Sequence, residues 1–404
     1  MSLKSTTLGD ALEDAIVFVD GDWVESKDQD PNGDIRLIQL ADIGDGDFIN
    51  KSLRFLTTAK AKELKCTLLE EGDILIARMP DPLGRACIFP GLNQKCVTVV
   101  DVCIVRVNPK KIHNRYLMHA LNSNDVRREI ERLATGTTRQ RISRGNLKTV
   151  EIPLPPLEEQ KRIADILDKA EALRAKRREA ISLINSLTQS IFLEMFGDPV
   201  TNQKKWNETL RLDQVAEVSS GITKGRNVKG KATREIPYMA VLNVQDKRLD
   251  LTTIKTIAAT EEEIEKYKLL ENDLLLTEGG DPDKLGRGSL WQNNLPEAIH
   301  QNHIFKVRIK DLNKVNPIFL NWLVGSLRGK KYFLKSAKQT TGIATINSTQ
   351  LKAFPLLLPP IDLQHQFASR VEKIHQTEQT LLQHHGLMEN AFASIQQKAF
   401  SGQL

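Results

Sequence analysis

The stretch that decides the fold runs from Pro155 to Gly197 and reads PPLEEQKRIADILDKAEALRAKRREAISLINSLTQSIFLEMFG. A related stretch, PPIDLQHQFASRVEKIHQTEQTLLQHHGLMENAFASIQQKAFSG, runs from Pro359 to Gly402. The two proline pairs lie 204 residues apart, and Gln160 aligns with Gln364 at the same shift. The first stretch carries apolar residues in steps of three and four, and the second carries them every seven residues, which are spacings of a helix that packs against another helix. We therefore expect one kind of long helix, used twice.

Each expected helix has a defined beginning and an apolar seam. Paired prolines suit a helix entrance, because the amides they lack would have no partner there. Gly197 followed by Asp198 and Pro199 is a stop signal. At about 1.5 Å per residue, residues 157–196 would form a rod of about 60 Å. The second seam is the weaker one, since polar residues occupy one of its rows. The predicted spacer and partner-contact residues are Leu157, Gln160, Ile163, Leu167, Ala170, Leu173, Ile184, Leu187, Ile191, Phe367, Ile374, Leu381, Met388 and Ile395.

The segments that precede the two helices also repeat. Ile35–Ile43 recurs as Ile236–Val244, and the pair Gly84–Arg85 recurs as Gly286–Arg287, within the same order of predicted strands and helices. We expect an α+β protein: two duplicated α/β globules separated by two long helices that form a coiled coil. The expected globules are residues 1–152 and 199–356, and the expected helical regions are residues 153–198 and 357–404.

Composition sets the class of protein without deciding its function. The length of 404 residues predicts two or three domains, and 27% charged residues are typical of a soluble protein. No apolar run approaches the roughly 18 residues of a membrane span, and the start MSLKSTTLGD lacks a signal-peptide core. We therefore expect a cytoplasmic protein without membrane contact. The net charge of +6 permits a polyanionic partner but does not require one.

The motifs of nucleotide-dependent enzymes are missing. Gly280–Gly286 has the wrong spacing for a phosphate-binding loop, and Asn108–Pro109 and Asn316–Pro317 do not continue into the Asn-Pro-Pro-aromatic motif of amino-methyltransferases. The four cysteines show no CxxC spacing, which favours buried thiols over zinc or disulfides. His300 and His303 lack further ligands nearby, so we assign them structural roles. We predict a chain without catalytic or metal-binding residues.

Basic, hydroxyl and amide side chains gather in the loops of both globules. Arginine and lysine neutralise phosphates, while hydroxyl and amide groups bind phosphates or base edges. Any one of these residues is more often ordinary surface, but their clustering in loops favours nucleic-acid contact. The loops differ between the globules, as recognition of two targets or neutral drift would make them. The predicted DNA-binding residues are Arg85, Thr137, Thr138, Arg139, Gln140, Arg141, Arg144, Lys224, Arg226, Arg287, Gln339, Thr340 and Thr341.

Three features together resemble the specificity subunit of type I restriction-modification enzymes: the duplicated order, the helix entrance PLPPLEEQKRIADIL (Pro153–Leu167) and the strand at Gly72–Ile76. The resemblance covers essentially the whole chain. In that family the globules are target recognition domains, and the helices pack antiparallel as a coiled-coil spacer. The resemblance implies a non-catalytic subunit that recognises an asymmetric bipartite target in double-stranded DNA, with one domain for each half-site.

The same resemblance implies partners and cofactors. Two modification subunits, which methylate adenine with S-adenosylmethionine, and two restriction subunits, which are ATP-dependent motor nucleases, would assemble with this chain. S-adenosylmethionine, ATP and Mg are expected only in those partners. A coiled-coil scaffold that carries two protein-interaction modules without DNA binding is an alternative. A stand-alone restriction or methylating enzyme is a third reading, which the missing motifs disfavour.

Overall fold

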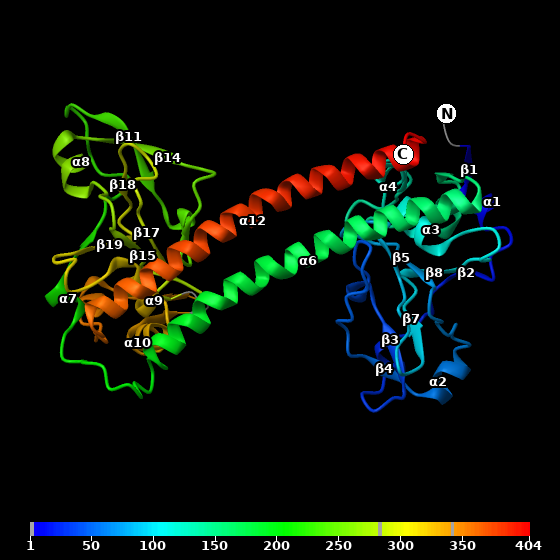
Figure 1. The fold of residues 1–404 in the computed structure, drawn as a ribbon, viewed down its shortest axis with the longest axis horizontal. Helices are drawn as coiled ribbons and strands as arrows, with labels where there is room; N and C mark the ends of the chain where they lie inside the picture. Colours follow the sequence, from blue (N-terminus) through cyan, green and yellow to red (C-terminus); the bar gives the residue numbers. More distant parts are fainter. Residues whose placement is uncertain (1–3, 282–284, 341–342) are drawn as a thin grey trace. The chain divides into compact units, whose positions relative to one another are not determined.

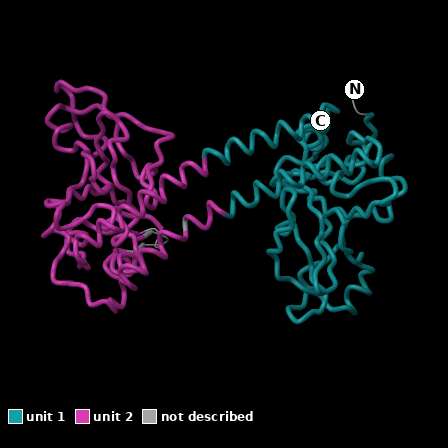
Figure 2. Tube along the Cα trace, viewed as in Figure 1, with its two compact units in different colours: residues 1–179, 383–404 teal, residues 180–382 magenta. Residues whose placement is uncertain are grey.

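The computed structural model describes residues 4–281, 285–340 and 343–404, without the side chains of Asn185, Gln339, Thr340 and Ile343. The chain divides into two compact units (Figure 2). Unit 1 comprises Met1–Glu179 and Gln383–Leu404, and unit 2 comprises Ala180–Leu382. Each unit contains one globule and one part of each long helix.

Unit 1 is built on two β-sheets. The first is antiparallel with strand order β2-β8-β5-β6, and the second has the order β4-β3-β7, in which β3 and β7 run parallel. Strand β1 pairs with β9, so that the first and last strands of the globule are neighbours. The strands are β1 (Ser5–Thr7), β2 (Val17–Asp20), β3 (Ile35–Ile38), β4 (Phe55–Leu56), β5 (Ile74–Ala77), β6 (Ala86–Ile88), β7 (Cys96–Thr98), β8 (Val102–Arg106) and β9 (Glu151–Pro153). The short helices are α1 (Leu8–Ala11), α2 (Thr58–Glu63), α3 (Asn114–Leu121), α4 (Asn124–Arg132) and α5 (Arg144–Lys148).

Strand β5 shows why this unit has two cores. All four of its residues are buried, and successive side chains of a strand point to opposite faces. Ile74 and Ile76 pack into the cluster that includes residues of α3 and α4. Leu75 and Ala77 pack into the cluster that reaches the second sheet. A continuous apolar run is therefore needed at this position, because both faces of the sheet are covered.

Unit 2 repeats the frame of unit 1. Its sheets have the orders β10-β19-β15-β17 and β14-β11-β18, with β11 and β18 parallel, and each strand takes the place of its unit 1 counterpart. The strands are β10 (Ala216–Ser220), β11 (Arg234–Met239), β12 (Val244–Gln245), β13 (Arg248–Leu249), β14 (Lys255–Ala259), β15 (Leu274–Thr277), β16 (Gly279–Gly280), β17 (Gly288–Leu290), β18 (Ile299–His300), β19 (Ile304–Ile309), β20 (Lys338–Thr340) and β21 (Ile343–Thr345). The short helices are α7 (Leu212–Val215), α8 (Glu261–Tyr267), α9 (Pro317–Val324), α10 (Leu327–Ser336) and α11 (Ser348–Lys352).

One ion pair recurs in both globules. Arg106 binds Asp73 through two hydrogen bonds of 2.7 and 2.8 Å, and Arg308 binds Asp273 through two of 2.7 Å. Both carboxylates are 1% exposed or less, so the guanidinium groups satisfy charges that would otherwise be buried alone. The predicted duplication of an α/β globule is confirmed at the level of strand order and of single side chains.

The two long helices are α6 (Leu157–Phe196) and α12 (Ile361–Ser401), shown in Figure 1. In unit 1, Ile163 of α6 shares a cluster with Ala399 of α12, and further along α6 Arg174 binds Glu389. Rising numbers on α6 meet falling numbers on α12, so the helices run antiparallel in this unit. In unit 2, other parts of both helices are in contact, since the rings of Phe192 and Phe367 lie 5.5 Å apart.

The residues of the predicted seams differ in burial between α12 and α6. The predicted row of α12, from Phe367 to Ile395, is buried or half-buried throughout. On α6, however, Leu173 is 59% exposed and Leu187 is 46% exposed, whereas Arg174 and Thr188 occupy the inner positions. The inner row of α6 recurs every seven residues without drift, and Leu173 and Leu187 each lie one residue before it; its members are Leu167, Arg174, Ile181, Thr188 and Met195. Both helices thus keep a buried or half-buried row at seven-residue spacing.

Candidate nucleic-acid interface

A short exposed loop follows α4 in unit 1. Thr137–Gln140 are exposed, and two backbone hydrogen bonds of 2.9 Å between Thr135 and Arg141 close the base of the loop. Gly136 has a φ of +97°, and a Cβ at this position would lie 2.5 Å from the carbonyl oxygen of Arg139. Glycine is required there because a side chain would be both strained and obstructed. The loop presents hydroxyl, amide and guanidinium groups from a fixed base.

Arg78 holds this loop from the protein interior. Its Nε atom donates a hydrogen bond of 2.9 Å to the carbonyl oxygen of Ile142, and its Nη1 atom lies 2.5 Å from a carboxylate oxygen of Asp20. Arg78 is 5% exposed. Arg141 is also engaged, because it pairs with Asp101 at 3.1 Å. Two arginines therefore fix the loop, and neither is a freely exposed cation.

The other predicted residues of this loop differ in what they contact. Arg139 is exposed and forms no ion pair within the described part of the chain. Arg144, at the start of α5, is half-buried and donates a hydrogen bond of 3.3 Å to the carbonyl oxygen of Phe18. Arg139 is thus an exposed cation of the loop.

Arg85 lies in the protein interior. It is 7% exposed, and its guanidinium donates hydrogen bonds of 2.7 to 3.2 Å to the carbonyl oxygens of Ile43, Leu40, Pro82 and Met79. These bonds join two loops that are far apart in the sequence. The position does not suit the DNA contact predicted for Arg85, because its donors are used inside the globule.

The predicted basic residues of unit 2 are divided in the same way. Lys224 is exposed, with its ammonium 5.1 Å from the ring centre of Tyr238. Arg226 binds Glu263 through two hydrogen bonds of 2.5 and 2.9 Å, and these bonds lower the pKa of that carboxyl to about 2. Arg287 is half-buried and donates to the side chain of Gln245 at 3.2 Å. Lys224 is the exposed cation among these three.

The remaining predicted residues lie in or next to strand β20. The backbones of Gln339 and Thr340 pair with Ala344 and Ile343 of β21, and β21 also pairs with β16. Their side chains lie outside the description, and Thr341 lies outside the described residues altogether. Unit 2 therefore has a strand hairpin in the region where unit 1 has the loop after α4.

The residues that close these two loops differ in charge: Arg78 in unit 1 and Glu278 in unit 2. The carbonyl oxygen of Arg78 accepts a hydrogen bond from the amide of Ile142, and the carbonyl oxygen of Glu278 accepts the equivalent bond from Ile346. Arg78 and Glu278 thus occupy equivalent places. Glu278 lies 2.5 Å from the Nδ1 atom of His303. One frame therefore holds an Arg78–Asp20 ion pair in unit 1 and a Glu278–His303 contact in unit 2.

His300 is part of the core of unit 2. Its side chain is fully buried, and Nδ1 lies 3.0 Å from the carbonyl oxygen of Ile304. Burial lowers the pKa of His300 to about 3, so the ring is neutral near pH 7. Among the residues that the structure describes, no group of three or more His, Cys, Asp and Glu side chains is arranged to hold a metal ion.

Comparison with known families decides what kind of protein carries these loops. The sequence model described as the type I restriction modification DNA specificity domain matches residues 11–183 and again residues 203–384. The chain belongs to this family. As a type I restriction-modification specificity subunit it has two recognition domains, one in each matched segment.

Curated relatives agree with this assignment. Over 318 residues, this chain is 25% identical to the type I restriction enzyme StySPI specificity subunit of Salmonella potsdam. The match covers 74% of this chain and 67% of the relative. Over 397 residues, it is 24% identical to the type I restriction enzyme EcoKI specificity subunit of Escherichia coli K12. This match covers 91% of the chain and 82% of the relative.

A solved chain from work on complex assembly and conformational transition of the type I R-M system shares the fold of the specificity subunit. The TM-score is 0.59 at 16% sequence identity, and the match covers 100% of this chain and 98% of the solved one. Among the described residues, no helix combines the length and the hydropathy needed to cross a bilayer.

The structure also assigns a buried position to Gln160, which the sequence pattern placed among the spacer and partner contacts. Gln160 is 1% exposed, and its Oε1 atom accepts a hydrogen bond of 2.9 Å from the amide of His113. Gln364 makes the same bond with the amide of Asn316 at 2.9 Å. In the sequence, only the alignment of Gln160 with Gln364 pointed to these positions. In the structure, each glutamine joins its globule to the start of its long helix.

Proposed function

We propose that this specificity subunit recognises an asymmetric bipartite target in double-stranded DNA, with one recognition domain for each half-site. The observation that carries the proposal is the pair of globules with one strand order and different loops, a short loop closed between Thr135 and Arg141 in unit 1 and the paired strands β20 and β21 in unit 2. Guanine offers acceptors in the major groove, whereas the amino groups of adenine and cytosine are donors. Domains with different loop chemistry on one frame would therefore select different base sequences.

The loop after α4 and its counterpart in unit 2 are the proposed DNA contacts. Arg139 would contact a phosphate or a base edge, and Thr137, Thr138 and Gln140 would supply neutral hydrogen-bonding groups. Lys224 would act as a phosphate contact in unit 2. Gln339, Thr340 and Thr341 remain predicted contacts of the hairpin.

The partners proposed for this chain are two modification subunits and two restriction subunits. We assign S-adenosylmethionine, ATP and Mg to those partners and no catalytic residue to this chain, and we place the complex in the cytoplasm. Helices α6 and α12 would set the distance between half-sites, with domain centres about 34 Å apart on the duplex, and would dock the modification subunits.

A domain exchange tests the proposal. Residues 1–149 are replaced by the corresponding segment of a relative with a different target, and the hybrid is assembled with the modification subunits. Sequencing of methylated adenines should show a change in one half of the target only. A matched hybrid, exchanged over residues 205–352, should change the other half. Changes in both halves from one exchange, or in neither, would contradict the assignment of one domain to each half-site.

The spacer role has its own test. Seven residues, one full heptad, are inserted after Ala175 and another seven before Met388, so that the seams stay in register. Each helix then gains about 10 Å, which corresponds to about three base pairs. The preferred target should gain a longer central gap with unchanged half-sites. An unchanged gap would show that the helices do not set the distance.

DNA binding itself separates this function from a protein-interaction scaffold. Fluorescence anisotropy with duplex fragments across a salt series should show affinity that falls steeply with salt, because phosphate contacts release counterions. The measurement is made with the chain alone and with the modification subunits. Absence of binding in both would favour the scaffold.

A further inference from the structure

Helix α4 of unit 1 and helix α10 of unit 2 hold equivalent places. The serines that precede them, Ser123 and Ser326, both donate a hydrogen bond to the carbonyl oxygen three residues earlier. The glycine of each Gly-Arg pair lies against Ile130 of α4 or Phe333 of α10, which are 2.8 and 2.9 Å from the place where its Cβ would be. Both comparisons give a shift of 203 residues, from 123 to 326 and from 130 to 333. The two helices can therefore be compared position by position.

The two helices share two cationic positions but differ in total charge. At the same shift, Arg128 and Arg132 of α4 correspond to Lys331 and Lys335 of α10. Helix α4 has three arginines and three carboxylates, whereas α10 has one arginine, three lysines and no carboxylate. The frame thus places a pair of cations at the same two positions in both units, and the residues around each pair differ.

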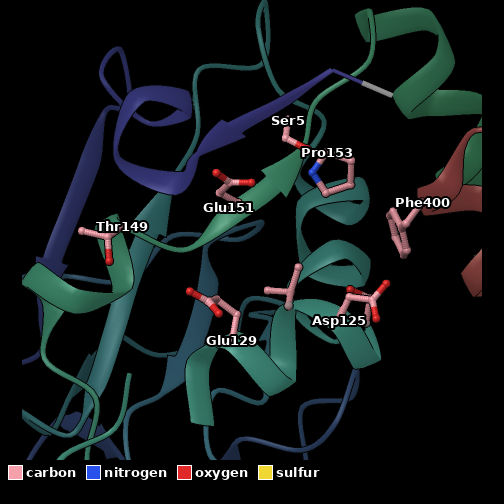
Figure 3. A pocket seen from close by; sticks show the side chains of 9 residues that line it. Ser5, Asp125, Glu129, Thr149, Glu151, Pro153 and Phe400 are labelled. Carbon is pink, nitrogen blue, oxygen red and sulfur yellow. The ribbon is translucent and has the colours of Figure 1, made fainter. Parts of the chain in front are cut away.

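In unit 1 both cations are paired within the helix. Arg128 pairs with Asp125, and Arg132 donates two hydrogen bonds of 2.9 and 2.6 Å to Glu129. Each acid stands three residues before its arginine, and Figure 3 shows the two carboxylates on successive turns of α4. The arginines of α4 therefore carry their counter-charges with them.

In unit 2 the corresponding lysines have no such partners. Arg328 and Tyr332 stand at the positions that the two acids hold in α4. Lys331 and Lys335 are exposed, and within the described part of the chain neither forms an ion pair or a side-chain hydrogen bond. Like charges one turn apart destabilise a helix. Helix α10 therefore keeps an unfavourable pair of charges that only a group from outside the chain would relieve.

The lysine pair faces solvent and lies directly before the hairpin that is proposed to contact DNA. Phe333, between the two lysines, is buried in the core of unit 2, and successive residues of a helix are about 100° apart, so the lysines lie on the opposite side of α10. Tyr332 donates a hydrogen bond of 3.0 Å to the carbonyl oxygen of Gln350, which fixes the helix further. Helix α10 ends at Ser336, and β20 begins at Lys338.

We propose that Lys331 and Lys335 form a phosphate-binding surface for double-stranded DNA beside the unit 2 half-site. This assignment rests on the proposed recognition of DNA by the two domains. The ammonium group of lysine is a compact point charge that suits phosphate, and a duplex offers phosphates on successive nucleotides, so both lysines are paired at once. The surface positions the domain without reading bases, because phosphate contacts carry no sequence information. Helix α4 supplies no equivalent contact, since its arginines are already paired.

The salt dependence of DNA binding tests the proposal. The double variant Lys331→Gln/Lys335→Gln of the full-length chain is assembled with the modification subunits, and fluorescence anisotropy is measured with a target duplex across a salt series. The slope of log affinity against log salt should decrease by about two, because two phosphate contacts are lost. The affinity for a duplex with an altered unit 2 half-site should fall by the same factor as the affinity for the target.

The matched control is Arg128→Gln/Arg132→Gln. It removes the same number of cations from the same positions of α4, and the slope should stay as in the wild type. Both pairs of substitutions lie at exposed helix positions, so both variants should remain folded, which circular dichroism checks.

Several outcomes would overturn the assignment. A steep wild-type slope that the lysine variant retains overturns this assignment alone and leaves the proposed function standing. An equal decrease in the lysine variant and the arginine control shows a general effect of net charge, and a loss confined to the target duplex shows a base contact. Loss of binding to the modification subunits with an unchanged DNA slope assigns the lysines to an acidic protein segment instead. A wild-type complex that does not bind duplex DNA overturns the proposed function as well.

Discussion

The Nε2 atom of His119 lies 2.7 Å from the Oδ1 atom of Asp168, and this contact joins α3 to α6. Arg115 binds the same carboxylate, with its Nη2 atom 2.8 Å from Oδ1. Burial alone would raise the pKa of Asp168, but the hydrogen bonds from His119 and Arg115 lower it from 3.8 to about 2. The first globule is thus attached to its helix through an ionised carboxylate.

Acid should weaken this attachment. Because the folded-state pKa of Asp168 is depressed, its contribution to stability is present above pH 4 and is lost as the pH falls toward 2. Asp168→Asn removes the contribution, so we expect the variant to be up to about 2 kcal/mol less stable than wild type at pH 7. The difference should shrink between pH 4 and pH 2 in urea unfolding followed by circular dichroism. Asp165→Asn, at an exposed position of α6, is the control. A difference that does not vary with pH would contradict the assignment.

Replacement of Gln160 should loosen the joint at the helix entrance. Gln160→Ala leaves the amide of His113 and the carbonyl oxygen of Pro155 without their side-chain partner. An unpaired buried polar group costs about 1–3 kcal/mol, and we expect a loss of that size in the free energy of unfolding. Gln189→Ala, at an exposed position on the same helix, should change stability by less than about 0.5 kcal/mol. Equal effects of the two substitutions would show that the buried bonds contribute nothing.

Arg85 should behave as a structural residue. Arg85→Ala removes a buried guanidinium that binds four carbonyl oxygens, and we expect a loss of about 2–4 kcal/mol in the free energy of unfolding. The dependence of DNA affinity on salt should keep its slope, measured at a temperature where the variant is folded. A flatter slope with unchanged stability would instead place Arg85 at the DNA.

Arg139 should behave in the opposite way. Arg139→Ala removes an exposed cation, so stability should change by less than about 0.5 kcal/mol. If Arg139 contacts a phosphate, the slope of log affinity against log salt should decrease by about one. Fluorescence anisotropy with a duplex that contains the target measures the slope. Arg162→Ala, on α6 and paired with Glu159, is the control that should leave the slope unchanged.

The sequence predicted the parts of the fold that depend on order and periodicity. The shift between Ile35–Ile43 and Ile236–Val244 identified two strands, β3 and β11, that hold the same place in their sheets. The paired prolines predicted the beginning of α6 at Leu157 and of α12 at Ile361 within one residue. Such signals are local, and tertiary contacts did not override them.

Contacts between residues that are far apart in the sequence could not be predicted in this way. Arg85 and Arg139 look alike in a sequence, and only the fold shows that one is surrounded by carbonyl oxygens and the other by solvent. Leu173 is exposed because the inner row passes through Arg174, and a polar residue in that row, next to a leucine beside it, cannot be recognised from apolar periodicity.

The joint made by Gln160 has a consequence for how such genes evolve. All of its bonds go to main-chain atoms, the amide of His113 and the carbonyl oxygens of Lys111 and Pro155, and Gln364 repeats this set in the second half. A crossover near a helix entrance can therefore import another globule and keep these main-chain bonds, although the contacts of Asp168 with His119 and Arg115 would need matching side chains. Recombination at this joint would exchange one recognition domain and leave the other unchanged.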